Sequence, residues 1–186
     1  MKQFGGAEIT RFLKAVDRHA EGPFRIVVIG GAAAALSYGA RGGTIDIDTA
    51  SNVAGLQGAC AAARKETGLD LPVGFVPIAE SPWEYESRLR RVAIRGLRKL
   101  NVWVPEKHDW ALTKITRLLE KDIEDILEVS GTAGFDKSVF LKRFIEEMTH
   151  IEPRVRLVRQ FLAMMEELYG EAEADRMEEA IRRSGS

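Results

Sequence analysis

The chain has 186 residues, 45% of them hydrophobic, which is enough for one compact domain with a helical extension. Charged residues make up 30%, but they nearly cancel, to a formal net charge of −1. This balance excludes a uniformly basic protein, so any surface for nucleic acid must be local. The single cysteine, Cys60, excludes an intrachain disulfide framework and a thiolate zinc site.

No segment approaches the roughly 20 consecutive apolar residues that a membrane span needs. The first ten residues, MKQFGGAEIT, also lack the apolar stretch of a signal peptide. We therefore expect a cytoplasmic protein without a membrane partner.

The first half of the chain alternates between helical and strand patterns. Residues 7–20 have helical spacing, and the β-branched run 25–29 predicts a buried strand. Gly30-Gly31 interrupts this run, and a helix is predicted to follow over residues 32–38. Residues 44–49 alternate and predict a second strand.

The next segments predict a helix and three further strands. The helix is expected over residues 54–67 and a strand over 73–78. A strand pair is expected over 91–94 and 100–104, with Gly96 near its turn.

After Pro105 the pattern becomes helical and remains so. One long helix is predicted over residues 110–129, and further helices are predicted over 138–148, 155–169 and 173–182. The expected fold is α/β (α+β), with a mixed sheet and flanking helices over residues 1–105. A helical region, residues 106–186, is expected to pack on this core.

The segment that says most about chemistry is Thr44-Ile45-Asp46-Ile47-Asp48. Because a strand alternates sides, Asp46 and Asp48 are predicted on one face and the two isoleucines on the other. Carboxylates whose backbone carbons lie about 6.5 Å apart repel each other unless a cation lies between them. Hard cations such as Mg²⁺ or Mn²⁺ prefer carboxylate oxygens, and two-metal sites suit nucleotidyl transfer. The alternative is a solvated polar strand face or a turn capped by aspartates.

The glycine pair Gly30-Gly31 gives the two aspartates a context. Backbone at such glycines can approach a phosphate, and the following helix offers N–H donors and a positive dipole end. The pair is not a Gly-x-Gly-x-x-Gly fingerprint, and no Gly-Lys-Ser/Thr of a P-loop follows. The glycine pair and the Asp-x-Asp motif are each weak signals alone. Their order, in which a strand, the glycine pair and a helix precede Asp-x-Asp, is a more specific signal of function.

In this order of motifs the chain resembles the DNA polymerase β-like nucleotidyltransferase superfamily. It is more closely similar to the AbiEii/MenT-type toxins and their relatives. Those proteins carry an Arg/Thr-x-Asp-Ile-Asp strand, then a helix with a lysine and a Lys/Arg-Asp pair. The matching positions here are Arg41, Thr44–Asp48, Lys114 and Lys121-Asp122, and the likeness covers roughly residues 25–130.

The resemblance implies metal-dependent transfer of a nucleoside monophosphate from a nucleoside triphosphate to an acceptor. It implies that Asp46 and Asp48 hold the metal ions, and that Lys114 neutralises phosphate charge while Asp122 or Asp125 orients it. The residues predicted to bind the nucleotide are Gly30, Gly31, Arg41, Thr44 and Lys114.

The acceptor implied by the resemblance is a tRNA end or a protein hydroxyl, and the chain would be the toxin of a toxin–antitoxin pair with an antitoxin partner. Many superfamily members add a third carboxylate, for which Asp70 and Glu80 are the nearest candidates. The alternative function is a catalytically weak or inactive binding or regulatory protein that retains the fold.

Helical spacing in residues 110–129 supports the likeness independently. Asp122 falls within an apolar stripe, where a carboxylate needs a partner or a role. Lys114 and Asp125 are neighbours at the edge of this stripe, where a cleft can reach them. A buried ion pair that pins the helix is the alternative for Asp122, and a solvated side chain is the alternative for Lys114. The stripe consists of Leu112, Ile115, Leu119, Ile123 and Ile126.

A basic run between residues 88 and 99 could attract a nucleic-acid acceptor such as tRNA. The alternative is the solvated outer face of a strand pair. The cations of this run are Arg88, Arg90, Arg91, Arg95, Arg98 and Lys99. Nearby aromatic residues could stack bases or belong to the core and its rim; they are Trp83, Tyr85, Trp103 and Trp110.

Overall fold

The computed structural model describes residues 2–184, which form two compact units. Within these residues the first unit runs to Ile78 and resumes over Arg88–Glu106. The second unit comprises Ala79–Ser87 and the chain from Lys107 onward. The predicted fold class is confirmed, because a small mixed sheet with flanking helices precedes a helical C-terminal half.

The first unit alternates helices and strands, as expected from its sequence pattern. Its helices are α1 (Gly6–His19), α2 (Gly30–Ser37) and α3 (Gln57–Thr67), the last preceded by a short 3₁₀ turn, η1 (Ala54–Leu56). Its strands are β1 (Phe24–Val27), β2 (Ile47–Thr49), β3 (Val73–Phe75), β4 (Arg90–Arg91) and β5 (Leu100–Val104).

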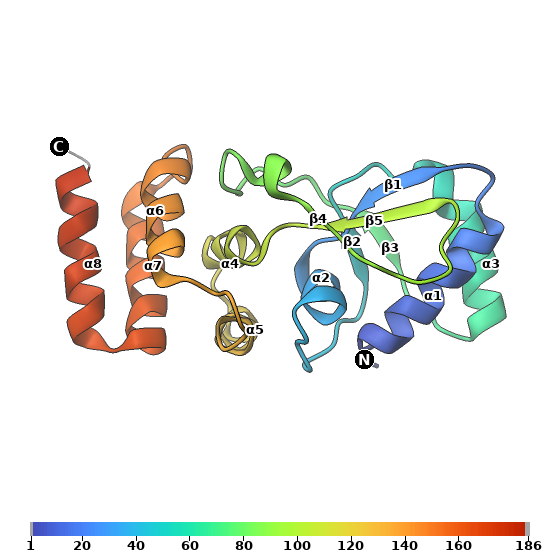
Figure 1. Cartoon of the computed structure of the whole chain (residues 1–186), viewed down its shortest axis with the longest axis horizontal. Coiled ribbons are helices and arrows are strands. Elements are labelled where there is room, and N and C mark those ends of the chain that lie inside the picture. Colours follow the sequence, from blue (N-terminus) through green and yellow to red (C-terminus); the bar gives the residue numbers. More distant parts are fainter. Residues whose placement is uncertain (1, 185–186) are drawn as a thin grey trace. The chain divides into compact units, whose positions relative to one another are not determined.

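The sheet of this unit is mixed (Figure 1). β1 pairs in parallel with β5, and β4 pairs antiparallel with the other edge of β5. β2 and β3 form a parallel pair, which an antiparallel bridge between Val28 and Thr49 joins to the end of β1. β5 alternates regularly, because Leu100, Val102 and Val104 are buried while the residues between them are half-buried on the opposite face.

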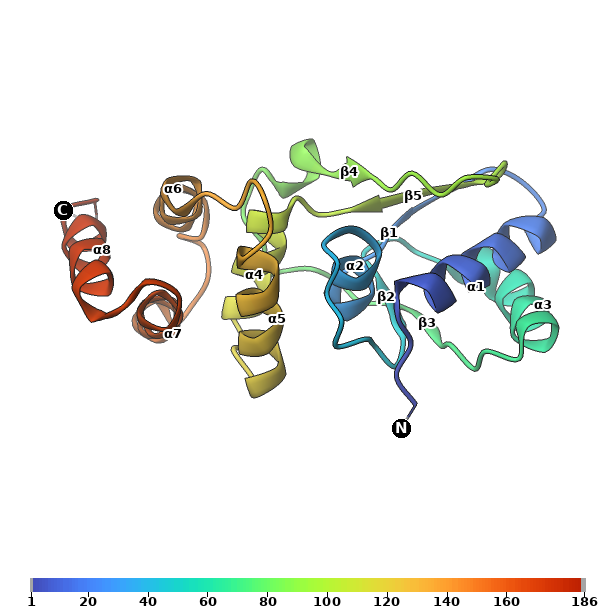
Figure 2. The same ribbon diagram turned by 60° about the horizontal axis from the view of Figure 1, so that its bottom comes forward.

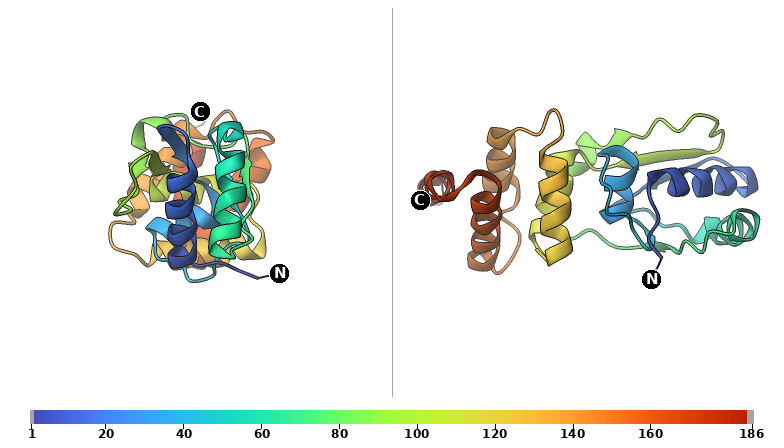
Figure 3. Two further views of the ribbon diagram at one scale, coloured as in Figure 1. Left: turned by 90° about the vertical axis from the view of Figure 1, so that its right-hand side faces the viewer. Right: turned by 90° about the horizontal axis from the view of Figure 1, so that it is seen from below.

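Helices α1 and α3 lie side by side (Figure 3) and cover one face of the sheet (Figure 2). The stripe predicted for the first helix is confirmed, since Ile9, Phe12, Leu13 and Val16 are all buried. The other face of the sheet carries the polar residues described below.

The second unit is helical, with a 3₁₀ turn, η2 (Tyr85–Arg88), where the chain returns to the first unit. Stacked aromatic rings form part of its core, with the ring centroids of Phe144 and Phe161 3.9 Å apart. In the part of the chain that the structure describes, no helix has both the length and the apolar character needed to cross a membrane. The helices are α4 (Lys107–Ile115), α5 (Glu120–Ser130), α6 (Lys137–Glu147), α7 (Arg154–Tyr169) and α8 (Glu171–Ser184).

A buried carboxylate near the end of α1 fixes the start of β5. The Asp17 side chain accepts hydrogen bonds from the backbone N–H groups of Arg98, Lys99 and Leu100, at 2.7–3.1 Å. Burial alone would raise the pKa of Asp17, but these three donors outweigh it and hold the pKa below its ordinary value. Asp17 therefore anchors the β4–β5 hairpin to the helical layer.

We expect Asp17→Ala to lower the free energy of unfolding by about 3 kcal/mol, because it leaves buried N–H donors without an acceptor. Urea denaturation followed by circular dichroism measures this loss. Glu66→Ala is the matched control, because Glu66 pairs with Arg18 and His19 at the surface of the same unit. Equal losses in the two variants would contradict an anchoring role for Asp17.

Candidate functional site

The glycine pair lies where β1 gives way to α2, as predicted. Gly30 has a φ of 61°, in the left-handed region that favours glycine, and Ile29 before it is extended. The helix then begins at once, so the N–H groups of its first turn have no partner within the helix. Ala32, Ala33 and Ala34 are buried, and their small size lets this turn pack closely on the unit.

Asp48 lies directly beside Gly30. A β-carbon added at Gly30 would lie 3.6 Å from Oδ2 of Asp48. The backbone is tied here as well, because the Ile29 N–H donates to the Asp48 carbonyl at 2.9 Å. Ile47 and Thr49 on either side are fully buried, so the half-buried Asp48 side chain lies on the sheet face opposite the core.

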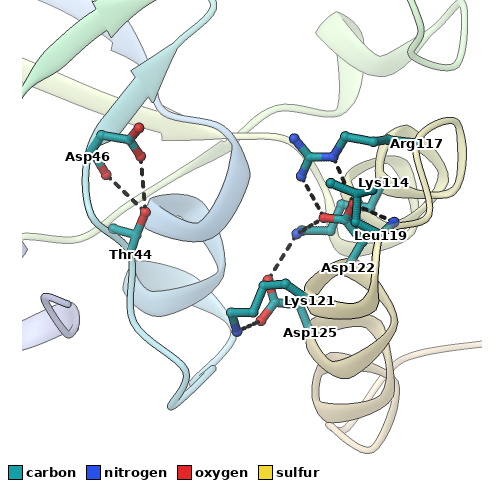
Figure 4. A network of polar contacts seen from close by, with 8 residues as sticks. All are labelled: Thr44, Asp46, Lys114, Arg117, Leu119, Lys121, Asp122 and Asp125. Atoms are coloured by element: carbon teal, nitrogen blue, oxygen red, sulfur yellow. Dashed lines mark hydrogen bonds and ion pairs between the residues drawn. The ribbon is translucent and has the colours of Figure 1, made fainter. Parts of the chain in front are cut away.

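Asp46 is linked to Gly31 through Thr44. A β-carbon at Gly31 would lie 3.1 Å from both Cβ and Oγ1 of Thr44, so only glycine fits there without displacing the threonine. The Thr44 hydroxyl faces the Asp46 carbonyl oxygen at 3.1 Å and its carboxylate Oδ1 at 3.2 Å (Figure 4). Paired backbone hydrogen bonds with Phe4, of 2.7 and 3.0 Å, hold Thr44 in place. Asp48 is thus positioned directly beside Gly30, and Asp46 is linked to Gly31 through Thr44.

The strand predicted over residues 44–49 is wrong in its first half. Only Ile47–Thr49 forms a strand, while Thr44 makes an isolated bridge with Phe4 and the chain bends at Ile45 and Asp46. Ile45 is consequently exposed and does not share the buried environment of Ile47. The cause is the competing pairing with Phe4, which draws Thr44 away from the line of β2.

The remaining candidates in this region lie in loops. Arg41 is exposed in the segment between α2 and Thr44. Asp70 is exposed in the loop before β3, and Glu80 is exposed in the second unit. Among residues 2–184 no group of three or more His, Cys, Asp or Glu side chains is placed to hold a metal ion. A hollow of about 370 Å³ under the β4–β5 hairpin is lined by none of the predicted site residues.

The structure brings Lys114, Asp122 and Asp125 together in the second unit (Figure 4). The Lys114 ammonium donates to Asp122 Oδ1 at 2.7 Å and to Asp125 Oδ2 at 2.9 Å. Asp122 is completely buried and Lys114 is only 7% exposed, so the lysine is not a solvated side chain. The Lys114 ammonium also lies 5.1 Å from the ring centroid of Trp110.

The single helix predicted over residues 110–129 is wrong. It is divided into α4 and α5 by a turn at residues 116–119, where Leu118 has a φ of 46°. Leu119 is 55% exposed and does not belong to a buried stripe. Asp122 favours the break because its carboxylate accepts the Leu119 N–H at 3.1 Å, as a residue in the first turn of a new helix does.

Two members of this ion network were not among the predicted site residues. Arg117 donates to both oxygens of Asp122, through Nε at 2.8 Å and Nη2 at 2.7 Å. Lys121 pairs with Asp125 one helical turn away. The Arg117 contact could not be found from a continuous helical wheel, because it depends on the turn between α4 and α5. The i, i+4 spacing of Lys121 and Asp125 was a usable signal.

A family model described as nucleotidyltransferase of unknown function (DUF6036) matches residues 7–168. The chain belongs to this family. The match spans the glycine pair, both aspartates beside it and the whole ion network of α4 and α5. Searches of the curated proteins and of the solved structures found no match to this member of the family.

The electrostatics of this nucleotidyltransferase-family chain are most perturbed at Asp122. Burial opposes ionisation, but the hydrogen bonds from Arg117 and Lys114 outweigh it and lower the pKa of Asp122 from 3.8 to about 2. A carboxylate whose pKa is lowered in the folded state stabilises the fold at pH values above its ordinary pKa. That stability is lost as the pH falls toward the pKa of the folded state.

We expect the difference in unfolding free energy between the wild type and Asp122→Asn to shrink by about 2 kcal/mol from pH 5 to pH 2. Urea denaturation of both proteins across this range measures it, and carboxylates common to both cancel in the difference. A difference that stays constant with pH would show that Asp122 is not ionised and paired in the folded protein.

Proposed function

We propose that the chain transfers a nucleoside monophosphate from a nucleoside triphosphate to an acceptor hydroxyl at the Gly30-Gly31 turn. The observation that carries this proposal is that Asp48 lies beside Gly30, while Thr44, which packs on Gly31, hydrogen-bonds Asp46, at a turn that opens a helix. The helix N-terminus favours phosphate, and the carboxylates favour the cations that accompany it.

The donor set fits Mg²⁺ or Mn²⁺. Magnesium is usually held by one or two carboxylates together with substrate phosphates and water, so it does not need a cage of protein ligands. Asp46 and Asp48 would supply the protein ligands, and the triphosphate would supply the rest. When bound, the metal neutralises phosphate charge and makes the acceptor hydroxyl easier to deprotonate.

The residues of the chain then have separate tasks. The positive end of α2, at its first turn, would face the triphosphate. Thr44 holds Asp46 in position. The acceptor oxygen forms a bond to the α-phosphorus. The bond between the α-phosphorus and the oxygen that bridges it to the β-phosphorus breaks, and pyrophosphate leaves. The hydroxyl proton passes to a nearby carboxylate or to water.

Lys114 is proposed to neutralise part of the triphosphate charge, with Asp122 and Asp125 as positioning residues. Two hydrogen bonds direct its ammonium, which supports the positioning part of this role.

The proposed acceptor is a tRNA end or a protein hydroxyl, and the proposed setting is the toxin of a toxin–antitoxin pair with an antitoxin protein as partner. The support is the likeness of residues 41–48 and 114–122 to the AbiEii/MenT-type toxins. A binding or regulatory protein that retains the fold is the second candidate. It predicts triphosphate binding that depends on the metal, with no transfer.

We expect Asp46→Asn and Asp48→Asn each to reduce transfer at least about 100-fold, because a neutral amide loses most of its attraction for a divalent cation. Each α-³²P-labelled triphosphate, incubated with Mg²⁺ and either bulk tRNA or protein, measures transfer. Asp175→Asn is the matched control, because Asp175 is an exposed aspartate on α8 and is not a candidate site residue. Wild-type turnover in either site variant at saturating Mg²⁺ would contradict the assignment.

We expect Lys114→Ala to weaken binding of a non-hydrolysable triphosphate about tenfold or more, because a charge-assisted hydrogen bond is lost. Isothermal titration measures affinity, and urea denaturation separately measures stability. Lys121→Ala is the matched control, because Lys121 belongs to the same network and is far more exposed. A Lys114→Ala protein that is less stable but binds with unchanged affinity would limit Lys114 to a structural role.

A further inference from the structure

The outer face of the β1–β5–β4 sheet carries an arrangement of planar and cationic side chains. Trp103 and Asn101 lie on this face because Leu100, Val102 and Val104 point into the core. Strand register places β1 on one side of β5 and β4 on the other. Arg25 of β1 is aligned with Asn101, and Arg91 of β4 is aligned with Trp103.

The side chains of this face contact one another. The guanidinium carbon of Arg25 lies 5.1 Å from the ring centroid of Trp103, in a cation–π arrangement. Arg91 donates from Nη2 to Asn101 Oδ1 at 3.0 Å, so its guanidinium is held next to the same strand. Arg25 and Arg91 are both exposed, and among residues 2–184 neither forms an ion pair with an acidic side chain.

This face continues to the candidate site within the same unit. Val27, the β1 neighbour of Trp103, points to the opposite side from Ile26 and Val28 and is itself buried, at 8% exposure. The bridge between Val28 and Thr49 places β2 beside the end of β1. The Asp48 side chain lies on the sheet face opposite the core. The Asp48 carbonyl accepts the Ile29 N–H, two residues beyond Val27, so Asp48 lies two strands across from Trp103 and about two residues further along the same sheet face.

We propose that this face binds single-stranded nucleic acid. A base stacks on the Arg25–Trp103 pair, Arg91 and Arg25 contact the phosphates, and the strand end is directed toward Asp46 and Asp48. Planar aromatic and guanidinium surfaces with adjacent cations are how proteins hold unstacked bases and their backbone. The use of the bound strand as the acceptor rests on the proposed function; the binding does not.

Single strands fit better than a duplex because the bases of a duplex are already stacked on each other. The hairpin carries a further exposed cation at Arg95. Lys99 does not belong to this set, because its ammonium is held by the backbone carbonyls of Arg18 and Ala20. Within the basic run, Lys99 thus stabilises the fold, whereas Arg91 is exposed on the outer face.

The test is fluorescence anisotropy of labelled 12-nucleotide RNA and DNA single strands, titrated with the full chain at low salt without triphosphate or Mg²⁺. We expect Trp103→Ala to weaken binding about tenfold and Trp103→Phe to retain most of it, because phenylalanine preserves a stacking surface. Arg25→Ala and Arg91→Ala should each weaken binding and reduce the dependence of log affinity on log salt by about one.

Two matched controls separate this face from general charge and aromatic effects. Trp83→Ala removes a tryptophan that is 64% exposed in the second unit, and Arg11→Ala removes an exposed cation from α1. Both should bind like the wild type. Circular dichroism confirms folding, and the exposed arginine variants keep the test decisive if Trp103→Ala does not fold. Tighter binding of RNA than of DNA identifies RNA as the ligand. Equal binding of the two identifies a site that does not distinguish ribose from deoxyribose.

The proposal is overturned if neither single strand binds. It is also overturned if the variants on this face bind like the wild type, or if a duplex or polyglutamate competes as well as a single strand. Binding without nucleotide transfer would contradict the proposed function but not this face. Transfer to an acceptor without binding of either oligonucleotide would contradict this face but not the proposed function.

Discussion

The close approach of Gly31 to Thr44 sets the geometry on which the rest of the candidate site depends. A β-carbon at this glycine would lie 3.1 Å from the threonine side chain, so the first turn of α2 can meet the Thr44–Asp48 segment only in its absence. Thr44 in turn hydrogen-bonds Asp46, and Asp48 approaches Gly30. The contact therefore holds Thr44 and the Asp46 that it bonds next to the first turn of α2, where Asp48 also lies.

The ion network of α4 and α5 follows a different physical logic. Removing Lys114, Asp122 and Asp125 from water is costly, and pairing offsets that cost only where the geometry is good. Here Asp122 receives hydrogen bonds from Lys114, Arg117 and the Leu119 N–H, so its burial is compensated. The same carboxylate stabilises the start of α5 and orients the lysine at the end of α4.

Local patterns in the sequence were enough to predict the glycine turn, the buried stripe of α1 and the helical C-terminal half. Prediction failed where a distant partner decides the local structure. Thr44 leaves the strand because it pairs with Phe4, forty residues earlier in the chain. The helix over residues 110–129 breaks because Asp122 caps a new helix, and a continuous wheel therefore missed Arg117. The face formed by Arg25, Trp103 and Arg91 required the register of three strands, which no local pattern contains.

The charges on the outer sheet face are segregated, and this has a consequence for the proposed reaction. Carboxylates lie at β2, whereas guanidinium groups lie on β1 and β4, on either side of Trp103. A polyanion held by the arginines is repelled by Asp46 and Asp48 until divalent cations neutralise them. The triphosphate brings such cations with it, so on the proposed mechanism its binding removes the electrostatic barrier to the acceptor end. On the proposed mechanism, segregated charge on neighbouring strands thus favours approach of the acceptor after the nucleotide has bound.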